Sequence, residues 1–398
     1  MALDPLPPLL TAAPRRIRDG SGEVRVSADI EGADPLWFSV AGEHEAILGD
    51  RADHVAVALL LPAMRYGRDL HVGGTVTDSL LHRLNHDLQP LVRSVHPGYR
   101  RVAVTADDVL PAGSAPAGVV TGFSGGVDSF ATLMEYALRP GVPSGMRITH
   151  LLNNNVGAHG DGGGALWETR YRALAPLAAD LGLPFLRVDS NIAVHYPHMG
   201  FMETATFRNA AAVHLLNGGV GRSYHASEGA YRNVRMPPLH GDIGLAGAMT
   251  FPLLSTPALT LESTGSGLSR IERTLALAGT PHARYLDVCI DPDPARTTNC
   301  SRCWKCMRTM LTLEVAGRLE EFVPHVFRRE PYLAQRARYY VELLASEEPN
   351  DVELVEFADA KDWRWGSATR PRAALRRAAR ATRAAARSLR RRVRPDVA

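Results

Sequence analysis

The stretch Thr121-Gly122-Phe123-Ser124-Gly125-Gly126-Val127-Asp128-Ser129 decides the fold prediction, because it places glycines, hydroxyls and a carboxylate between a strand and a helix. Residues 117–123 form an apolar run typical of a buried strand, and residues 130–138 switch to helical spacing. N–H groups at the start of a helix favour anions, and glycine lets a phosphate approach the backbone. The stretch therefore predicts a phosphate-binding turn in which Ser124 and Ser129 add hydroxyls and Asp128 could hold Mg²⁺.

Glycine turns of this kind also occur in α/β proteins that bind no nucleotide, so the other residues of the turn must show whether it binds phosphate. The string SGGVDS at 124–129 lacks the lysine that a Walker-type loop carries after its last glycine. It resembles the SGGxDS signature of the PP-loop ATP pyrophosphatases. The resemblance implies cleavage of ATP to AMP and pyrophosphate, which activates a carboxyl, amide or carbonyl oxygen as an adenylate. It also implies that the ATP is held by Ser124, Gly125, Gly126, Val127, Asp128 and Ser129.

The composition indicates a globular chain. Its 398 residues, 45% of them hydrophobic, can fill more than one core. The longest apolar run, 55–64, contains Pro62 and is too short to span a bilayer, and the N-terminus has no basic region followed by an apolar stretch. We therefore expect no membrane span and a cytoplasmic location.

Changes of pattern along the chain predict five segments. These are a loose lead-in (1–20), a small α/β domain (21–110), a PP-loop domain with a zinc knuckle (117–315), a helical extension (316–362) and a basic tail (363–398). The small domain should contain strands at 24–28, 36–40 and 101–105, and helices at 54–66 and 78–88, the second ending before Pro90. Nothing in it has the spacing of a catalytic site.

From residue 119 on, short strands alternate with helices of ten or more residues. The strands are expected at 119–123, 148–153, 185–188 and 223–226, and the helices from 129 and at 166–181 and 204–217. This order predicts a doubly wound, mainly parallel sheet with helices on both faces, which the resemblance narrows to a HUP-like domain. Ligands of such sheets bind at the carboxyl ends of the strands.

The loop that follows the second of these strands, 153–164, is polar and rich in glycine. An ordinary surface loop has the same composition. In PP-loop enzymes the nucleotide base lies near the end of this strand, so the resemblance favours a role for Asn153 in nucleotide binding.

All four cysteines fall within eighteen residues, as Cys289, Cys300, Cys303 and Cys306. The two-residue gaps let neighbouring thiolates converge on one ion, and four sulfur ligands match a closed, structural zinc site. Disulfides, a redox pair and an iron–sulfur cluster are the alternatives. We expect the metal to pin the segment after the sheet against the edge of the active site.

The cysteines narrow the resemblance to the 7-cyano-7-deazaguanine synthases, over roughly residues 117–312. Those enzymes have a similar zinc site, an Arg-Asn pair that matches Arg208-Asn209, and a Thr-Lys pair that looks like Ser269-Arg270. The segment that contacts their deazaguanine has no clear counterpart in residues 226–238. The resemblance therefore carries over the ATP chemistry and the zinc, and it leaves the substrate open.

Pyrophosphate leaving the α-phosphorus needs cations beyond the turn. Motif position makes Arg208, Arg270, Lys305 and Arg308 the candidates, although solvated charges beside a zinc knuckle are an equal explanation for the last two. Glu228 could be a second Mg²⁺ ligand or a substrate contact, or could simply cap a loop.

The cysteines limit which nucleophile can attack the adenylate. Every cysteine is committed to the metal, which disfavours sulfur transfer, and Ala2 follows Met1, so no N-terminal cysteine supplies a glutaminase. We expect an AMP-forming ligase that acts on a small molecule with ammonia, free or from a partner protein, or with an amine. The alternatives are a tRNA-modifying enzyme and a nucleotide-binding protein without turnover.

The basic tail dominates the charge. Residues 364–398 contain twelve arginines and one aspartate, so the net +3 of the chain hides a body of −8. On a helix, six arginines recur at steps of three and four and form one stripe: Arg376, Arg380, Arg383, Arg387, Arg390 and Arg394. The stripe could contact RNA, or the tail could be a solvated extension; its other face is too weakly apolar for membrane insertion.

Overall fold

A computed structural model describes residues 6–18, 20–160, 163–234, 236, 241–296 and 299–393, the last eleven of these by their backbone alone. The chain divides into two compact units. Unit 1 comprises Met1–Gly267 with Pro292–Ala295, and unit 2 comprises Leu268–Asp291 with Arg296–Ala398. Each unit is described by itself below.

Unit 1 is built on an eight-stranded sheet with the order β11-β10-β7-β8-β9-β4-β3-β2. The first five of these are parallel: β7 (Gly118–Gly122), β8 (His150–Asn155), β9 (Phe185–Ser190), β10 (Val220–Ala226) and β11 (Thr260–Thr264). The chain runs outward from β7 to β9 and then returns to the other side of β7 with β10. The strand order therefore reverses between β7 and β10.

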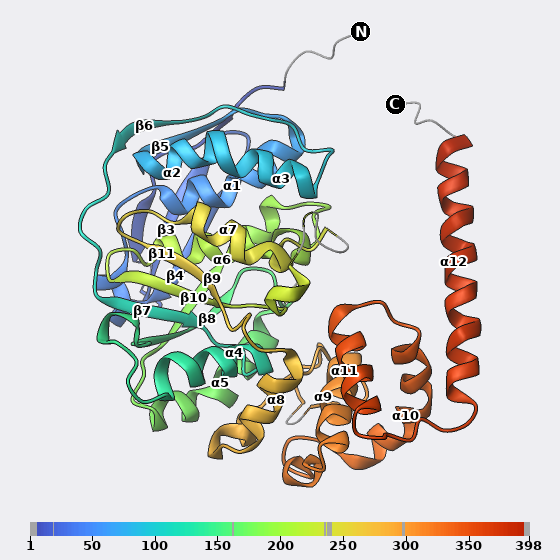
Figure 1. Cartoon of the computed structure of the whole chain (residues 1–398). Helices are drawn as coiled ribbons and strands as arrows, with labels where there is room; N and C mark the ends of the chain where they lie inside the picture. Colours follow the sequence, from blue (N-terminus) through green and yellow to red (C-terminus); the bar gives the residue numbers. More distant parts are fainter. Residues whose placement is uncertain are drawn as a thin grey trace. The chain divides into compact units, whose positions relative to one another are not determined.

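Helices cover both faces of this sheet (Figure 1). α4 (Val127–Leu133), which continues as a π-helical turn to Leu138, and α5 (Gly164–Asp180) lie on one face. α6 (Phe201–Leu215) and α7 (Gly247–Leu254) lie on the other. Right-handed crossovers on the two sides of β7 put the helices on opposite faces. The prediction of a mainly parallel α/β sheet with helices on both sides is confirmed.

The amino-terminal strands extend the same sheet. β2 (Arg15–Arg18), β3 (Glu23–Ile30) and β4 (Ala33–Ala41) are antiparallel, and β4 pairs with β9 through Phe38 opposite Ser190 and Ser39 opposite Asp189. The segments 21–110 and 117–267 thus share one sheet and one compact unit, where separate domains were expected. The pairing satisfies the backbone groups that β9 would otherwise expose as an edge strand.

A smaller sheet, β1-β5-β6, completes unit 1, with β1 (Leu9–Leu10), β5 (Leu70–Thr77) and β6 (Val104–Leu110) all parallel. α1 (Asp53–Tyr66) packs on both α6 and β5. The apolar run 55–64 is consequently buried along its whole length. Among the described residues, no helix combines the length and apolarity needed to cross a bilayer.

The second helix of the small domain does not end before Pro90. α2 (Asp78–Arg83) leads through a π-helical turn, Leu84–Leu88, into α3 (Gln89–Val95). Pro90, which has no N–H to donate, lies just after this π-helical turn, and such irregular turns accommodate a break in the regular hydrogen bonding of a helix. The last strand of this segment also begins three residues later than expected, at Val104.

Unit 2 is helical, which confirms the expected helical carboxyl-terminal region. It contains α8 (Arg270–Ala278), α9 (Trp304–Val315), α10 (Arg329–Leu344), α11 (Pro349–Asp359) and α12 (Thr369–Val393). α9 contacts α8, α10 and α11 and carries the buried Met310 and Leu313. Because α9 is the centre of this packing, the cysteine segment belongs with the helices rather than with the sheet.

Candidate functional site

The turn after β7 is closed by its own hydroxyls. The Gly126 N–H donates to Ser124 Oγ at 3.3 Å, Ser129 Oγ donates to the Gly126 carbonyl at 3.0 Å, and the two hydroxyls are 3.4 Å apart. Gly125 has φ +73°, in the left-handed region that favours glycine. The backbone path of the turn therefore depends on the residue types that the sequence singled out.

The turn lies at the start of α4 and is only partly exposed. Ser124 is exposed and Asp128 is half-buried, while Gly125 and Ser129 are buried. The helical bonding starts with the Phe130 N–H, which donates to the Gly126 carbonyl at 3.0 Å. N–H groups that precede such a bond have no partner within the helix and suit an anion.

The turn lies at the point where the strand order reverses. β7 and β10 are parallel neighbours, and Thr121 Oγ1 donates to the Tyr224 carbonyl at 3.1 Å between them. Open α/β sheets bind ligands at this place, beyond the carboxyl ends of the strands. The structure therefore locates the predicted phosphate-binding turn where the topology favours a ligand.

The loops after β10 and β11 lie at the same edge. Ser227 N–H donates to the Thr264 carbonyl at 2.8 Å, and Thr264 Oγ1 is 3.0 Å from Thr132 Oγ1 of α4. Glu228 is half-buried in the first of these loops. Its Oε1 lies close to Gly244: a Cβ added to Gly244 would be 2.9 Å from this oxygen. The sequence missed Thr264 because the five-residue strand β11 was not recognised.

Asn153 lies next to the turn. Gly122 of β7 pairs with Leu152 of β8, and the Phe123 N–H donates to the Leu152 carbonyl at 2.8 Å. Asn153 is buried, and its Oδ1 has no hydrogen-bond partner among the described residues. The neighbouring Asn154 is engaged with Asn209 at 2.8 Å. Asn153 thus keeps one unused acceptor at the edge where a nucleotide base is expected.

Arg208 of α6 is buried and has no carboxylate within reach in the described part of the chain. Its guanidinium donates to the carbonyls of Val156, at 3.3 Å, and Met199, at 3.4 Å, and lies over the Tyr196 ring at 4.3 Å from the centroid. Burial lowers the pKa of Arg208. These hydrogen bonds go to the loop after β8 and to the loop before α6, rather than to the turn.

Asn209 is likewise engaged within the scaffold. Its Nδ2 donates to the Ala205 carbonyl at 2.7 Å, and its Oδ1 accepts from Asn154. In the structure, both Arg208 and Asn209 make hydrogen bonds near the end of β8. A direct contact of either residue with ATP stays a prediction from the resemblance.

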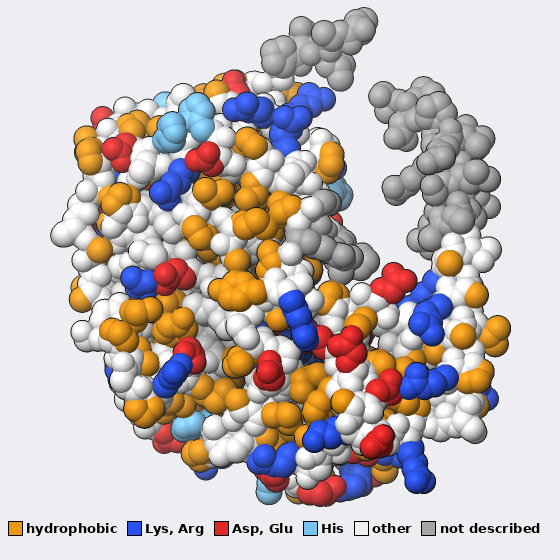
Figure 2. All heavy atoms as spheres, viewed as in Figure 1, with side chains coloured by type: hydrophobic (Ala, Val, Ile, Leu, Met, Phe, Trp, Pro, Cys, Tyr) orange, Lys and Arg blue, Asp and Glu red, His pale blue; other side chains and the backbone are white. Residues whose placement is uncertain are grey.

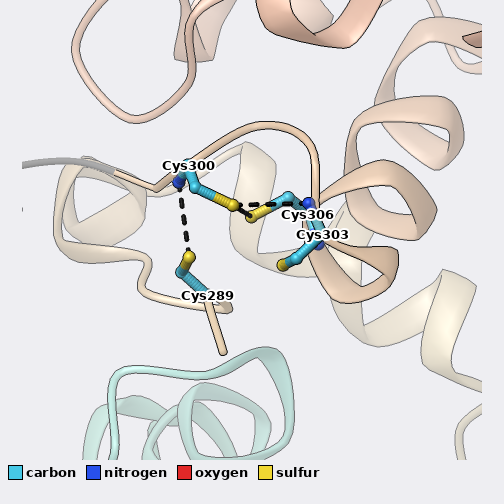
Figure 3. A group of neighbouring side chains, drawn as sticks. All are labelled: Cys289, Cys300, Cys303 and Cys306. Atoms are coloured by element: carbon cyan, nitrogen blue, oxygen red, sulfur yellow. Dashed lines mark hydrogen bonds between the residues drawn. The ribbon is translucent and has the colours of Figure 1, made fainter. Parts of the chain in front are cut away.

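The four cysteines converge in unit 2 (Figure 3). Cys289 comes from the loop after α8, and the other three lie at or just before the start of α9. Their sulfur atoms all lie within 4.8 Å of one another, with Cys300 and Cys306 4.0 Å apart. A tetrahedral zinc with bonds of about 2.3 Å separates its sulfurs by about 3.8 Å. The cluster could therefore hold a metal ion such as zinc after small adjustments.

Backbone N–H groups already point at the sulfurs. Cys300 N–H donates to Cys289 Sγ and Cys303 N–H donates to Cys300 Sγ, both at 3.3 Å. Side-chain hydrogen bonds with Cys289 and Cys306 lower the pKa of the Cys303 thiol to about 3, whereas side-chain hydrogen bonds with Cys289 and Cys303 raise the pKa of Cys306. N–H donors stabilise thiolates, which are the form that binds metal.

Asn299 supports the cluster from behind. It accepts from the Val288 N–H at 2.9 Å and donates to the carbonyls of Leu286 and Val326 at 2.8 and 3.1 Å. Asn299 thereby links the loop that carries Cys289 to the loop that carries Cys300. No sequence pattern points to Asn299, since its hydrogen-bond partners are up to 27 positions away.

The three remaining cationic candidates lie in unit 2. Arg270 is the first residue of α8, after the cap formed by Ser269, and Lys305 Nζ lies 5.4 Å from the Trp304 ring centroid. Arg308 is buried and bonds to Glu348 and Asp351 at 2.8 Å each. Two carboxylates compensate the charge of Arg308, which disfavours this side chain as a phosphate ligand. Roles of Arg270 and Lys305 at ATP stay predictions.

No family model, curated protein or solved structure matches this chain. Unit 1 offers a turn rich in glycine and serine, a carboxylate and an unused amide acceptor at one sheet edge. Unit 2 offers a closed set of four sulfur ligands.

Proposed function

We propose that this chain is an AMP-forming ligase that splits ATP between the α and β phosphates to adenylate a small-molecule carboxylate. The observation that supports the proposal is the Ser124–Ser129 turn, which leaves β7 where the strand order of the sheet reverses. The strand order and the turn together fit a HUP-like PP-loop domain. A Walker-type ATPase is disfavoured because Val127 and Asp128 occupy the place of its lysine.

The proposed chemistry has two steps. A carboxylate oxygen attacks the α-phosphorus, and the bond from that phosphorus to the bridging oxygen breaks, releasing pyrophosphate. Ammonia or an amine then attacks the acyl carbon, AMP leaves with the bonding electrons, and the nitrogen loses a proton. Both leaving groups are anions, so donors fixed at the turn would stabilise the developing charge.

The residues of the turn divide this work. Backbone N–H groups around Gly126 and the Ser124 and Ser129 hydroxyls would hold the pyrophosphate end. Asp128 would bind Mg²⁺, an ion that prefers carboxylate and phosphate oxygens and neutralises phosphate charge. Asn153 Oδ1 would accept a hydrogen bond from the adenine amino group, because it is buried beside the turn without a described partner.

The cysteine cluster supports nitrogen rather than sulfur chemistry. With Cys289, Cys300, Cys303 and Cys306 on one ion, no coordination position is open to water and no cysteine remains to carry sulfur. We assign the ion a structural role in unit 2. Zinc determination by plasma mass spectrometry should find one zinc per chain, and less after Cys303→Ser.

The test is pyrophosphate release from ATP with a panel of carboxylates and ammonia, together with exchange of labelled pyrophosphate into ATP. Asp128→Asn should lower both rates by at least about 100-fold, as expected when a metal ligand at a developing charge is lost. Asp108→Asn is the matched control, because Asp108 is an exposed aspartate on β6 of the same unit. Its rates should equal those of the wild type.

Two results would contradict the proposal in different ways. Equal activity of wild type and Asp128→Asn would remove the turn from the chemistry. ATP binding that Asp128→Asn abolishes, without pyrophosphate release for any carboxylate tested, would instead identify a nucleotide-binding protein without turnover.

A further inference from the structure

The carboxyl-terminal helix α12 carries a charge that the ATP chemistry does not use. It has 25 residues, ten of them arginine and none acidic. Side chains are described for its first part, where all five arginines are exposed: Arg370, Arg372, Arg376, Arg377 and Arg380. Basic side chains gather over this first part of α12 in Figure 2.

Only some of these charges are compensated within unit 2. Arg370 pairs with Asp359 at 2.7 Å, and Arg376 reaches Glu342 at 3.3 Å. Arg372, Arg377 and Arg380 have no carboxylate partner among the described residues; Arg380 donates to the Ala345 carbonyl at 2.9 Å. Since α12 contributes no acid of its own, its field is positive along the part that is described.

The arginines also have a regular spacing. Arg372, Arg376 and Arg380 are four residues apart and therefore lie along one side of the helix. The sequence continues with arginines at 383, 387 and 390, at steps of three and four, and adds arginines at 391 and 392. Alanine fills most of the other positions, so the arginines are the chemistry that α12 offers a partner.

We propose that α12 is a docking surface for the phosphate backbone of a double-helical nucleic acid. A helix of 25 residues extends about 37 Å at 1.5 Å per residue. A duplex presents one negative charge per 1.7 Å, hence about 22 phosphate charges over that length. Arginine suits this partner because its planar guanidinium binds phosphate oxygens in pairs.

A membrane surface fits α12 less well. Interfacial helices place tryptophan, phenylalanine and leucine opposite their basic residues. Residues 369–393 contain no aromatic side chain, and their larger aliphatic residues are only Leu375, Leu389 and Val393. A helix whose other faces are mainly alanine offers charge without the apolar area that insertion requires.

The test uses the full-length protein and fluorescence anisotropy with two labelled probes, a 20-base-pair RNA duplex and a DNA duplex of the same sequence. The variant R372Q/R377Q/R380Q removes the three arginines that lack a described carboxylate partner. R15Q/R139Q/R172Q is the matched control, because it removes the same charge from exposed arginines of unit 1. Circular dichroism checks that each variant is folded.

We expect the α12 variant to bind at least about 10-fold more weakly at 100 mM salt. Its plot of log affinity against log salt should be shallower by about 3, one for each lost phosphate contact. The control should change the affinity less than twofold, and R372K/R377K/R380K should retain most of it. A preference for the RNA probe would show that A-form geometry or the 2′-hydroxyl contributes, and equal binding would assign the contact to phosphate alone.

Equal affinity of wild type and the α12 variant for both duplexes would overturn the proposal. So would binding to vesicles of phosphatidylserine and phosphatidylcholine that depends on the same arginines, with no binding to either duplex. Pyrophosphate release is measured in parallel and should be unchanged by the α12 variant. The proposal for α12 and the proposal for ATP chemistry can thus fail independently.

Discussion

Replacing Gly125 with alanine tests whether the backbone of the Ser124–Ser129 turn binds the nucleotide. Gly125 has φ +73°, which an L-residue with a Cβ reaches only at a cost. The two hydroxyl contacts that close the turn involve Gly126 and both serines, so they hold the neighbouring backbone while residue 125 is strained. Alanine at 125 should therefore disfavour the folded path of the turn.

The cost follows from the backbone geometry. A left-handed conformation costs an alanine about 1–2 kcal/mol relative to glycine. This corresponds to about a 5- to 30-fold smaller population of the correctly shaped turn, and to the same factor in apparent ATP affinity if only that shape binds. Asparagine tolerates the left-handed region better than alanine, so Gly125→Asn should lose less affinity.

The assay is ATP titration by isothermal calorimetry, with thermal unfolding of each variant. Gly141→Ala is the matched control, since Gly141 has φ +79° and no atom near its missing Cβ. It pays a similar strain at the far end of the helical run that starts at Val127. We expect both alanine variants to lower the unfolding temperature by similar amounts, and only Gly125→Ala to weaken ATP binding.

Two results would refute this reasoning. Wild-type ATP affinity in Gly125→Ala would show that the turn does not hold the phosphates. Equal loss of affinity in Gly125→Ala and Gly141→Ala would assign the effect to general destabilisation of unit 1.

Three further predictions concern stability. Chelating the metal should unfold the cysteine segment of unit 2, because structural zinc contributes about 10–16 kcal/mol in small zinc domains. Loss of helical circular dichroism and faster proteolysis near Cys289 would show this unfolding. Unchanged spectra would contradict the prediction. Asp351→Asn should destabilise unit 2 by about 2 kcal/mol, since it removes one of two carboxylates from the buried Arg308, while Glu356→Gln on the same helix should not. Burial lowers the pKa of His54 from 6.5 to about 4, so the contribution of His54 to the free energy of unfolding is complete above pH 6.5 and declines by about 3 kcal/mol as the pH falls to 4. Denaturant unfolding of His54→Gln should therefore show a weaker pH dependence over that window than the wild type. An identical pH dependence would refute this prediction.

The sequence alone predicted the local features of unit 1 well. The turn at 124–129, strands within two residues of β7, β8 and β9, and helices close to α5 and α6 all followed from short-range patterns. Glycine spacing, helical periodicity and apolar runs act over a few residues, so they can be recognised without knowing the partners of each strand. The spacing of the cysteines is also a short-range pattern. It predicted that the four sulfurs converge, and the structure brings all four together.

Long-range pairing is what sequence reasoning missed. The junction of β4 with β9 joins residues 38 and 190, and it merges segments 21–110 and 117–267, which the sequence pattern had assigned to separate domains. α1 became a buried layer between α6 and β5, which its apolar run did not specify. Such contacts depend on which edges and faces remain uncovered once the local elements have formed.

Charges show the same division within the candidate sites. The sequence identified Arg208, Arg270, Lys305 and Arg308 as cations near motifs, but it could not tell which of them have partners. Only the tertiary structure showed that Glu348 and Asp351, about forty residues away, compensate Arg308 and that Arg208 is buried against backbone carbonyls. The sequence determines which side chains are charged, whereas the burial of each charge and its ion-pair partners depend on elements that meet only after folding.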